Sequence, residues 1–227
     1  MANTPDTINR GLYGLRGLCL AFVVAALAVS AAPMSAQLAK RSADDWIATL
    51  DAPARVQGLK VGEVLPRLGL KPGQIVADVG AGTGIFSIQF SRSVRPGGKV
   101  YSVEVDEKLL EHILASATEQ GIGNIEGVLG EYDDPALPEA VDLAFINDVL
   151  HHIEHREVYL KNLVKYLKPA GRVAIIDFKP GQGGHASDAT LQVSQEQATT
   201  WMAAAGWKPV QVISDVYPDR WFVIFGR

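Results

Sequence analysis

Residues 76–86 read Val76-Ala77-Asp78-Val79-Gly80-Ala81-Gly82-Thr83-Gly84-Ile85-Phe86, and this run sets the architecture expected for the whole chain. An apolar segment with β-branched residues reaches an acid and breaks into three glycines on alternate positions, after which apolar residues recur at helical spacing. This pattern predicts a strand, a tight turn and a helix. Glycine lets the backbone approach a ligand closely, and the first N–H groups of the helix point toward that ligand. The run therefore predicts a nucleotide-type binding loop.

The glycine spacing narrows the class of ligand. A dinucleotide fingerprint would place its last glycine at Ile85, but here it comes one residue earlier, at Gly84. A phosphate-binding Walker loop would need Gly-Lys-Ser/Thr, which the run does not contain. Three glycines at a helix start cost about 1 kcal/mol each unless the backbone needs them. A ligand is therefore favoured over a ligand-free turn.

The pattern D-x-G-x-G-x-G from Asp78 to Gly84 resembles motif I of the class I S-adenosylmethionine (SAM) dependent methyltransferases. The resemblance covers about residues 61–227 and implies that the glycine loop holds the amino-acid portion of SAM while Asp78 orients the turn. The cofactor-binding residues that it implies in this loop are Asp78, Gly80, Ala81, Gly82 and Gly84.

The composition of the chain limits its domain organisation and its possible functions. A chain of 227 residues with 48% apolar residues allows one α/β domain with an ample core. The net charge of −4 argues against a general nucleic-acid binder, because such domains usually carry a basic face. The single cysteine, Cys19, lies in an N-terminal apolar segment, so the chain forms no internal disulfide and its globular part has no cysteine nucleophile.

The N-terminus has the pattern of a targeting segment. Arg10 and Arg16 precede an apolar stretch, and small residues follow it up to a possible cleavage point after Ala36. This pattern predicts a secretory signal over residues 1–36 and an exported protein. The alternative is a membrane anchor, because residues 17–39 form an uncharged run that could span a bilayer if it is not cleaved.

Residues 37–60 are predicted to be a linker and a helical cap, ahead of a methyltransferase domain over 61–227. We expect Trp46 to be a packing residue and Arg55 a solvated one, rather than parts of the site. Apolar residues from Val61 to Leu68 are spaced for one face of a helix, which ends at Lys71-Pro72-Gly73.

Glu104 ends the second predicted strand, 20 residues beyond Gly84. A carboxylate at this distance from the loop can accept hydrogen bonds from both ribose hydroxyls of a nucleotide. In the family that the chain resembles, the acid that ends strand two falls on Glu104, and Val105 follows it in the predicted cofactor site. After the third strand, residues 125–129, the resemblance places Glu131 and Tyr132 near the adenine.

The run 141–146, apolar except for Asp142, suits a strand buried on both faces, which places Asn147 and Asp148 at the edge where open α/β sheets bind ligands. The resemblance places motif IV here, with Asn147 also near the cofactor. A helix is predicted over 158–167, with a stop at Lys168-Pro169-Ala170-Gly171. The fifth predicted strand, 172–178, comes next and ends at Asp177, another acid at a carboxyl end. The predicted residues at the transfer site are Asn147, Asp148, His151 and Asp177.

Histidines follow this strand and leave the general base open. His151 or His152 could serve as a base near neutral pH, or they could be surface or capping residues. His151 and His155 are four residues apart, but the order around them is not the H-E-x-x-H of zinc proteases, and no metal is expected. His185, in the glycine-rich connection 179–193, is a candidate substrate contact.

Strands and helices alternate along the chain until two strands, 210–216 and 221–225, flank a short turn. This order predicts a doubly wound, mostly parallel α/β sheet with a terminal antiparallel hairpin. The family that the chain resembles has seven strands in the order 3-2-1-4-5-7-6, which agrees with the number of strands predicted here.

The sequence therefore predicts a SAM-dependent methyltransferase that acts on an unidentified acceptor, with a small molecule as the favoured class. A noncatalytic exported SAM-binding module is one alternative, because SAM is made in the cytosol. A nicotinamide-dependent oxidoreductase would keep the fold and Glu104 but does not match the glycine spacing. The oligomeric state stays open.

Overall fold

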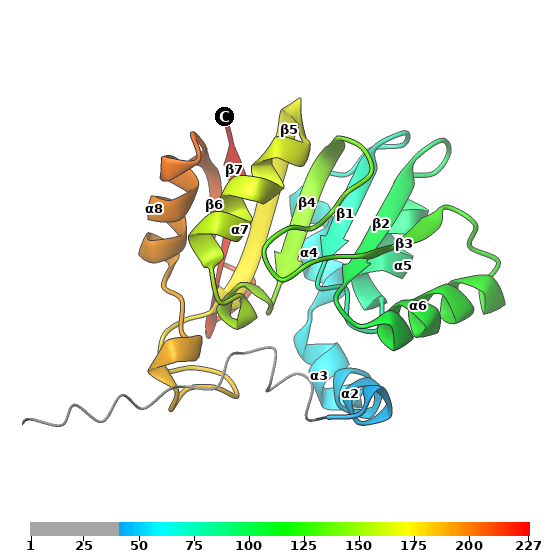
Figure 1. Cartoon of the computed structure of the whole chain (residues 1–227), viewed down its shortest axis with the longest axis horizontal. Coiled ribbons are helices and arrows are strands. Elements are labelled where there is room, and N and C mark those ends of the chain that lie inside the picture. The colour runs from blue at the N-terminus through cyan, green and yellow to red at the C-terminus, as the bar shows by residue number, and fades with distance from the viewer. Residues whose placement is uncertain (1–40) are drawn as a thin grey trace, which may run out of the picture. The chain divides into compact units, whose positions relative to one another are not determined.

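A seven-stranded sheet in the order β3-β2-β1-β4-β5-β7-β6 forms the centre of the computed structural model, which describes residues 41–227 (Figure 1). Neighbouring strands from β3 to β5 run parallel, and β7 runs antiparallel to both β5 and β6. The predicted strand order and terminal antiparallel hairpin are thus confirmed. The strands are β1 (Ile75–Val79), β2 (Lys99–Glu104), β3 (Ile125–Leu129), β4 (Val141–Asn147), β5 (Leu167–Phe178), β6 (Lys208–Ile213) and β7 (Arg220–Gly226).

Helices cover both faces of the sheet (Figure 1). One core cluster joins the sheet to α4 (Val61–Leu68), α5 (Ile85–Ser93) and α6 (Glu107–Glu119), and a second joins it to α7 (Arg156–Leu163) and α8 (Gln195–Ala204). Two short helices precede them, α2 (Ala43–Leu50) and α3 (Pro53–Gly58), and three 3-10 turns lie in the connections, η1 (Leu150–His152), η2 (Val164–Tyr166) and η3 (Ala189–Leu191). This is the layered arrangement of a doubly wound α/β domain.

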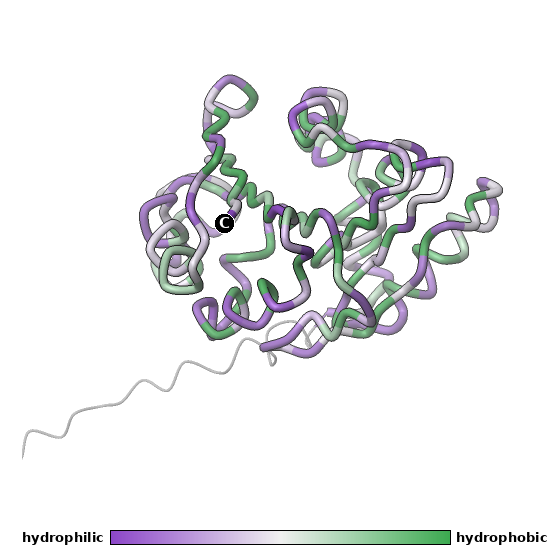
Figure 2. Tube along the Cα trace, turned by 90° about the horizontal axis from the view of Figure 1, so that it is seen from above, coloured by the Kyte–Doolittle hydropathy of each residue, from purple (hydrophilic) through white to green (hydrophobic). Residues whose placement is uncertain are grey.

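Strand β4 is apolar from Leu143 to Ile146 because both of its faces are covered. Leu143 and Phe145 lie in one core cluster, and Ala144 and Ile146 lie in the other, all without exposure to solvent. Successive side chains of a strand point to opposite faces, so a strand covered on both sides must be apolar at every position. Figure 2 shows the hydrophobic stretches concentrated in the central strands and the hydrophilic stretches in the loops around them.

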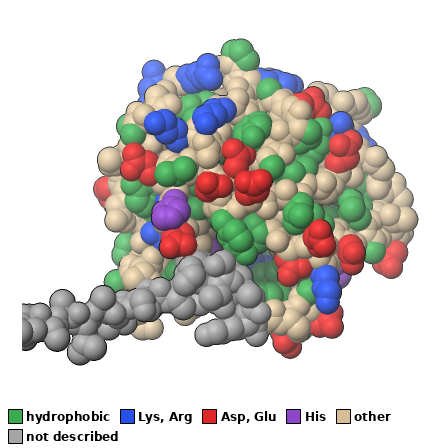
Figure 3. Space-filling view, in the orientation of Figure 1, with side chains coloured by type: hydrophobic (Ala, Val, Ile, Leu, Met, Phe, Trp, Pro, Cys, Tyr) green, Lys and Arg blue, Asp and Glu red, His purple; other side chains and the backbone are tan. Residues whose placement is uncertain are grey.

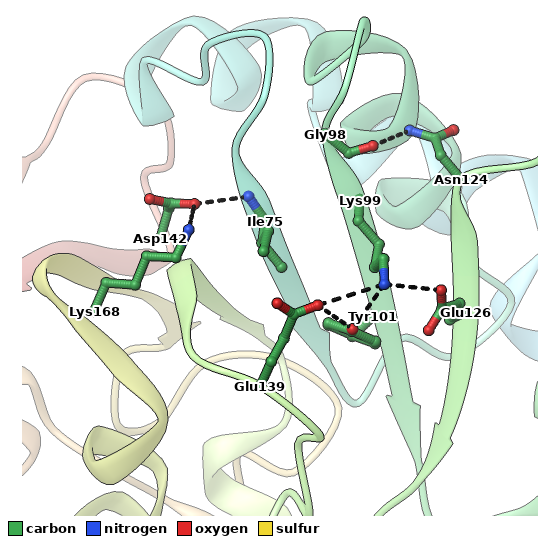
Figure 4. Close-up of polar contacts among 9 residues, drawn as sticks. All are labelled: Ile75, Gly98, Lys99, Tyr101, Asn124, Glu126, Glu139, Asp142 and Lys168. Carbon is green, nitrogen blue, oxygen red and sulfur yellow. Dashed lines mark hydrogen bonds and ion pairs between the residues drawn. The ribbon is translucent and has the colours of Figure 1, made fainter.

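Polar contacts connect the strands at their amino ends (Figure 4). The Asp142 carboxylate accepts hydrogen bonds from the Ile75 N–H at 2.8 Å and from Lys168 Nζ at 2.7 Å. Lys99 Nζ lies 3.0 Å from Glu126 and 3.4 Å from Glu139. Each exposed pair contributes little stability, typically about 0–1 kcal/mol. Together they join the first five strands at the edge opposite the carboxyl ends, where ligands of such sheets bind.

Strand β5 begins earlier than the sequence predicts. The expected helix over 158–167 ends at Leu163 as α7, continues as the 3-10 turn η2, and gives way to the strand at Leu167. Val141 pairs with Leu167 across a register shift, and Lys168 contacts Asp142 on β4. Strand β4 pairs with Leu167 and again from Arg172 onward, so Lys168–Gly171 lie within β5 as an irregular segment, where the local sequence predicts a helix stop.

The predicted signal over residues 1–36 and the alternative anchor over 17–39 lie outside the described residues, as does Cys19. Both targeting interpretations stay predictions. Among residues 41–227, no helix has the length and apolar character needed to cross a membrane.

Candidate active site

The glycine loop adopts backbone conformations that side chains disfavour. Gly80, Gly82 and Gly84 have φ values of 68°, 60° and 80°, in the left-handed region. A Cβ on Gly80 would lie 2.4 Å from the side chain of Val149, and one on Gly84 would lie 3.0 Å from Ile113. The left-handed backbone favours glycine at all three positions, and packing against Val149 and Ile113 adds a second requirement at Gly80 and Gly84, which the sequence did not predict.

Asp78 stabilises the glycine turn through buried hydrogen bonds. Its carboxylate is 3% exposed and accepts a hydrogen bond from the Ser87 hydroxyl at 2.6 Å, and the Ser102 hydroxyl lies 2.7 Å from that of Ser87. Burial raises the pKa of Asp78 to about 7, against the opposing effect of the Ser87 hydrogen bond. This chain of hydrogen bonds connects β1, α5 and β2 directly under the glycine loop.

Glu104 lies opposite the loop, at the end of β2. One carboxylate oxygen accepts a hydrogen bond from the Gly82 N–H at 2.6 Å, and the other accepts one from the Val105 N–H at 3.1 Å. Burial raises the pKa of Glu104 to about 7, although the Gly82 N–H favours the charged form. Glu104 therefore contacts the glycine loop directly, a contact that its spacing in the sequence suggests but does not specify.

A cavity of about 630 Å³ opens at the carboxyl ends of β1, β2 and β4. Its volume lies in the roughly 300–1,000 Å³ range of small-molecule and cofactor sites. Most of the predicted site residues line it: Asp78, Gly80, Ala81, Gly82, Glu104, Val105, Glu131, Tyr132, Asn147 and Asp148. Three predicted residues, Gly84, His151 and Asp177, do not line this cavity. Gly84 instead starts α5 and packs against α6.

The N-terminal helices α2 and α3 form one wall of the cavity. Trp46, Leu50 and Arg55 all line it, although the sequence indicates only packing and solvated roles for Trp46 and Arg55. The Thr83 hydroxyl donates a hydrogen bond to the Asp51 carboxylate at 2.5 Å, which joins this wall to the glycine loop. The only sequence signal was the helical pattern around Trp46, because the contacts that place it are long-range.

The α3 end of this wall is also attached to the C-terminal hairpin. The Tyr217 hydroxyl donates to the Leu59 carbonyl at 2.5 Å, and Arg220 Nη1 donates to the Gly58 carbonyl at 2.9 Å. Arg220 also lies over the ring of Tyr217, 4.9 Å from its centroid. Segments about 160 residues apart therefore jointly fix α3 beside the cavity.

Asn147 and Asp148 lie on the cavity wall as predicted. Asp148 has a φ of 56°, in the left-handed region, and its N–H donates to the Ile176 carbonyl at 3.0 Å. Its carboxylate pairs with Arg220 Nε at 3.3 Å, yet burial raises its pKa to about 6. Asn147 Oδ1 is buried and has no hydrogen-bond partner among residues 41–227. These groups are available to polar atoms of a ligand.

His151 and His152 point in different directions. His151 is buried, and its Nδ1 lies 2.6 Å from the Asp177 carboxylate, so this pair is held behind the cavity wall rather than in the cavity. The 3-10 turn η1 turns His152, and not His151, toward the cavity. Burial and the neighbouring His151 lower the pKa of His152 to about 3. The orientation expected for His151 and Asp177 therefore differs from the one observed.

The cavity has an acidic lining. Among the residues 41–227 that the structure describes, Arg55 is the only Lys or Arg in the lining, against seven carboxylic acids: Asp78, Glu104, Asp106, Glu131, Asp133, Asp148 and Glu154. Figure 3 shows acidic side chains across the middle and lower part of one face of the molecule, while basic side chains gather at its upper edge. A cleft lined by one sign of charge favours ligands of the opposite sign. The cavity therefore suits a cation such as a sulfonium.

A family model described as a methyltransferase domain matches residues 70–218. The curated relatives include the ubiquinone/menaquinone biosynthesis C-methyltransferase UbiE of Ectopseudomonas mendocina (strain ymp), which is 29% identical over 116 residues. These residues are 50% of this chain and 45% of that protein, so the chain spans less than half the length of this relative.

Two solved structures share the fold. A SAM-dependent methyltransferase from Aquifex aeolicus has a TM-score of 0.71 at 26% identity, over 82% of this chain and 98% of that one. The magnesium protoporphyrin IX methyltransferase of Synechocystis PCC 6803, solved with bound S-adenosylhomocysteine (SAH), has a TM-score of 0.58 at 20% identity, over 76% of this chain and 81% of that one. The second likeness supports the fold alone.

The sheet order, the glycine loop and the acid at the end of β2 together define a Rossmann-like, class I SAM-dependent methyltransferase domain. The family match covers about two thirds of the chain, and this chain belongs to the methyltransferase-domain family. SAM is accordingly the cofactor, and the nicotinamide-dependent alternative is set aside.

The residues present fit SAM. The cavity has the size of a cofactor site, its acidic lining suits the positive sulfonium, and Glu104 presents a buried carboxylate at the ribose position expected from the sequence. Glu131 and Tyr132 line the same cavity from the loop after β3, where the adenine is expected.

Proposed function

We propose that this protein transfers the methyl group of SAM to a small molecule held in the cavity. One observation carries the proposal: a single cavity joins the glycine loop and Glu104 to a second set of polar groups, Asn147, Asp148 and His152. Direct group transfer between two ligands requires cofactor-binding and reactive groups in one shared cavity.

The part of the cavity beside the glycine loop and Glu104 binds SAM and orients it. SAM supplies a methyl group on a sulfonium, which is already activated for in-line displacement. The left-handed glycines let the backbone of the loop lie close to the amino-acid portion without a Cβ in the way, and the Glu104 carboxylate accepts hydrogen bonds from the ribose hydroxyls. Asp78 keeps the loop in place through Ser87. These contacts fix the direction in which the methyl group faces the acceptor.

The part of the cavity that contains Asn147, Asp148 and His152 would hold the acceptor. Of these residues, Asp148 is better suited than His152 to act as the general base. An efficient general base has a pKa near the working pH, and burial raises that of Asp148 to about 6. His152 is a poor proton acceptor near neutral pH, because its pKa is lowered to about 3. If the acceptor loses a proton on methylation, we assign that proton to the Asp148 carboxylate. Asn147 Oδ1 is left to orient the acceptor by a hydrogen bond.

The acceptor is proposed to be small and partly apolar. Apolar and aromatic side chains line the same cavity beside its acidic groups: Trp46, Leu50, Leu59, Tyr132 and Ile153. Such a lining binds a ligand mainly by burying its apolar surface, while a few polar groups fix its orientation. The relative from Ectopseudomonas mendocina, named for ubiquinone/menaquinone biosynthesis, supports this class of acceptor.

Transfer of a labelled methyl group tests the proposal. The full chain is incubated with SAM carrying an isotopically labelled methyl group and a bacterial extract that contains both small molecules and proteins. We expect label in the small-molecule fraction with the parent and with Glu126→Gln, a change at the opposite edge of the sheet. We expect strongly reduced label with Glu104→Gln.

Label confined to the protein fraction would contradict a small-molecule acceptor. Binding of SAM without transfer to any fraction would favour the noncatalytic alternative.

A further inference from the structure

Three of the five histidines of the chain come together beside the cavity, although the sequence predicts no metal site. His151 and His152 lie in η1, and His185 comes from the connection between β5 and α8. The His151 ring centroid lies 4.1 Å from that of His152 and 5.4 Å from that of His185, and the latter two are 5.1 Å apart. One ring nitrogen of each histidine lies within 4.8 Å of the other two.

His151 has a free nitrogen that points into a buried space. Its Nδ1 must carry the proton that it shares with the Asp177 carboxylate, because a carboxylate only accepts hydrogen bonds. Its Nε2 then presents a lone pair, and this atom is buried without a hydrogen-bond partner among residues 41–227. A buried polar atom without a partner usually costs about 1–3 kcal/mol, so its retention calls for a ligand.

Asp177 orients His151 as a carboxylate orients a metal-binding histidine. One carboxylate oxygen accepts from the His151 ring at 2.6 Å, and the other accepts from the His151 backbone N–H at 3.0 Å. Histidines that bind metals usually donate their second ring N–H to a carboxylate or carbonyl, which fixes the tautomer and the ring orientation. Asp177 thus has a defined role although it does not face the cavity.

Arg156 holds the two contributing segments together. Its guanidinium donates to the carbonyls of Leu150 at 3.1 Å and of His151 at 2.7 Å, both in η1. It also donates to the Thr190 carbonyl at 2.7 Å, in η3, on the segment that carries His185. Three backbone contacts from one side chain thus join η1 to the segment that carries His185.

We propose that His151, His152 and His185 bind one divalent transition-metal ion, with Zn²⁺ as the favoured ion. Imidazole nitrogens suit zinc, whereas Mg²⁺ and Ca²⁺ prefer oxygen ligands. Zn–N bonds of about 2.0–2.1 Å in a tetrahedral site place ligand nitrogens about 3.3 Å apart, so the rings must close by about 1.5 Å. His185 is exposed and can make this movement. Three protein ligands leave the fourth position open.

The order of residues explains why spacing in the sequence does not reveal this site. His151 and His155 do not share a helix face, because η1 ends at His152 and His155 is the N-cap of α7. The third ligand instead comes from His185, more than thirty residues later. His152 lines the cavity as well, so the proposed ion lies in the cavity wall, on the side of Asp148.

Direct metal binding by the full chain, without a polyhistidine tag and after removal of metals by a chelator, tests the proposal. Zn²⁺ is titrated in competition with a chromophoric chelator, and Co²⁺ is used to detect the visible absorption of a four-coordinate site. We expect one ion per chain. We expect His185→Gln and His152→Gln to weaken binding by roughly 100-fold or more, because each removes a ligand rather than an orienting partner.

His112→Gln and His155→Gln are matched controls, because each removes one histidine and leaves the three ligands in place. Both are expected to bind Zn²⁺ like the parent, and circular dichroism verifies the folding of every variant. Asp177→Asn is expected to weaken binding about 10- to 100-fold. Equal affinity in the parent and in His185→Gln, or less than one ion per parent chain, would overturn the proposal. The result does not depend on SAM binding or on methyl transfer.

Discussion

A single added carbon, the Cβ of an alanine at Gly80, would disturb the glycine loop. At Gly80 a Cβ would meet both the left-handed backbone, φ 68°, and the two methyl groups of Val149, at 2.4 and 2.8 Å. We expect Gly80→Ala to lower the free energy of unfolding by about 2–4 kcal/mol, from backbone strain plus overpacking. Urea unfolding measures this loss.

The two causes can be separated by a double-mutant cycle. Val149→Ala removes the methyl groups that the new Cβ would meet, so Gly80→Ala should cost about 1 kcal/mol less in that background. Gly62→Ala in α4 is the matched control, because its Cβ meets nothing within 4 Å and its φ is not left-handed. It should leave stability unchanged or raise it by up to about 1 kcal/mol. Equal losses for Gly80→Ala and Gly62→Ala would refute this account of the loop.

At the scale of single residues, the sequence predicts the cofactor side of the site better than the acceptor side. Glu104 could be predicted because a strand end and a fixed distance from Gly84 are both local features. The direction of His151 could not, because it depends on the 3-10 turn η1 and on a hydrogen bond to Asp177, 26 residues away.

At the scale of elements, the helices α2 and α3 complete the cavity. The bond from the Thr83 hydroxyl to Asp51 joins α2 to the glycine loop, so we expect Asp51→Ala to weaken SAM binding about 5- to 10-fold, the value of one hydrogen bond. Thr83→Val removes the same bond from the other side and should give a similar loss. Calorimetric titration with SAM measures both.

A double variant shows whether loss of the Thr83–Asp51 hydrogen bond itself, rather than a general disturbance of the fold, weakens SAM binding. The double variant should bind SAM no more weakly than either single variant, because the same interaction is lost in each. Asp44→Ala, at the exposed start of α2, is the control and should bind like the parent. Additive losses in the double variant would contradict the proposed connection.

The bounds of β5, β6 and β7 cannot be predicted from the local sequence alone. The sequence predicts that Lys168–Gly171 stops a helix, yet this segment lies within β5, because β4 pairs with Leu167 before it and with Arg172 after it. The hairpin at the C-terminus is predicted correctly in type, but β6 spans Lys208–Ile213 rather than 210–216, and β7 spans Arg220–Gly226 rather than 221–225. Pairing with neighbouring strands, and not the local sequence alone, sets these bounds.

At the scale of the whole molecule, the strand order is predictable because each strand and helix carries its own period and the family resemblance supplies their arrangement. The position of α2 and α3, which complete the cavity wall, cannot be predicted in this way. It depends on contacts such as Tyr217 to Leu59, which join residues 158 positions apart and leave no local pattern in the sequence.

The pKa of Glu104 gives SAM binding a defined pH dependence. Burial raises this pKa to about 7 in the free protein, so Glu104 keeps its proton at pH 6 and has largely lost it at pH 8. Ribose hydroxyls donate to the ionised carboxylate, so binding below pH 7 must release the proton. Affinity should therefore rise about tenfold from pH 6 to pH 8.

Isothermal titration of the full chain with SAM at pH 6 and pH 8 tests the central claim most directly. We predict one SAM per chain, tighter binding at pH 8, and affinity reduced roughly 10- to 100-fold at pH 8 in Glu104→Gln, which should also lose the pH dependence. Glu126→Gln should behave as the parent. Absence of measurable SAM binding by the parent, or unchanged binding by Glu104→Gln, would contradict the assignment of this cavity to SAM.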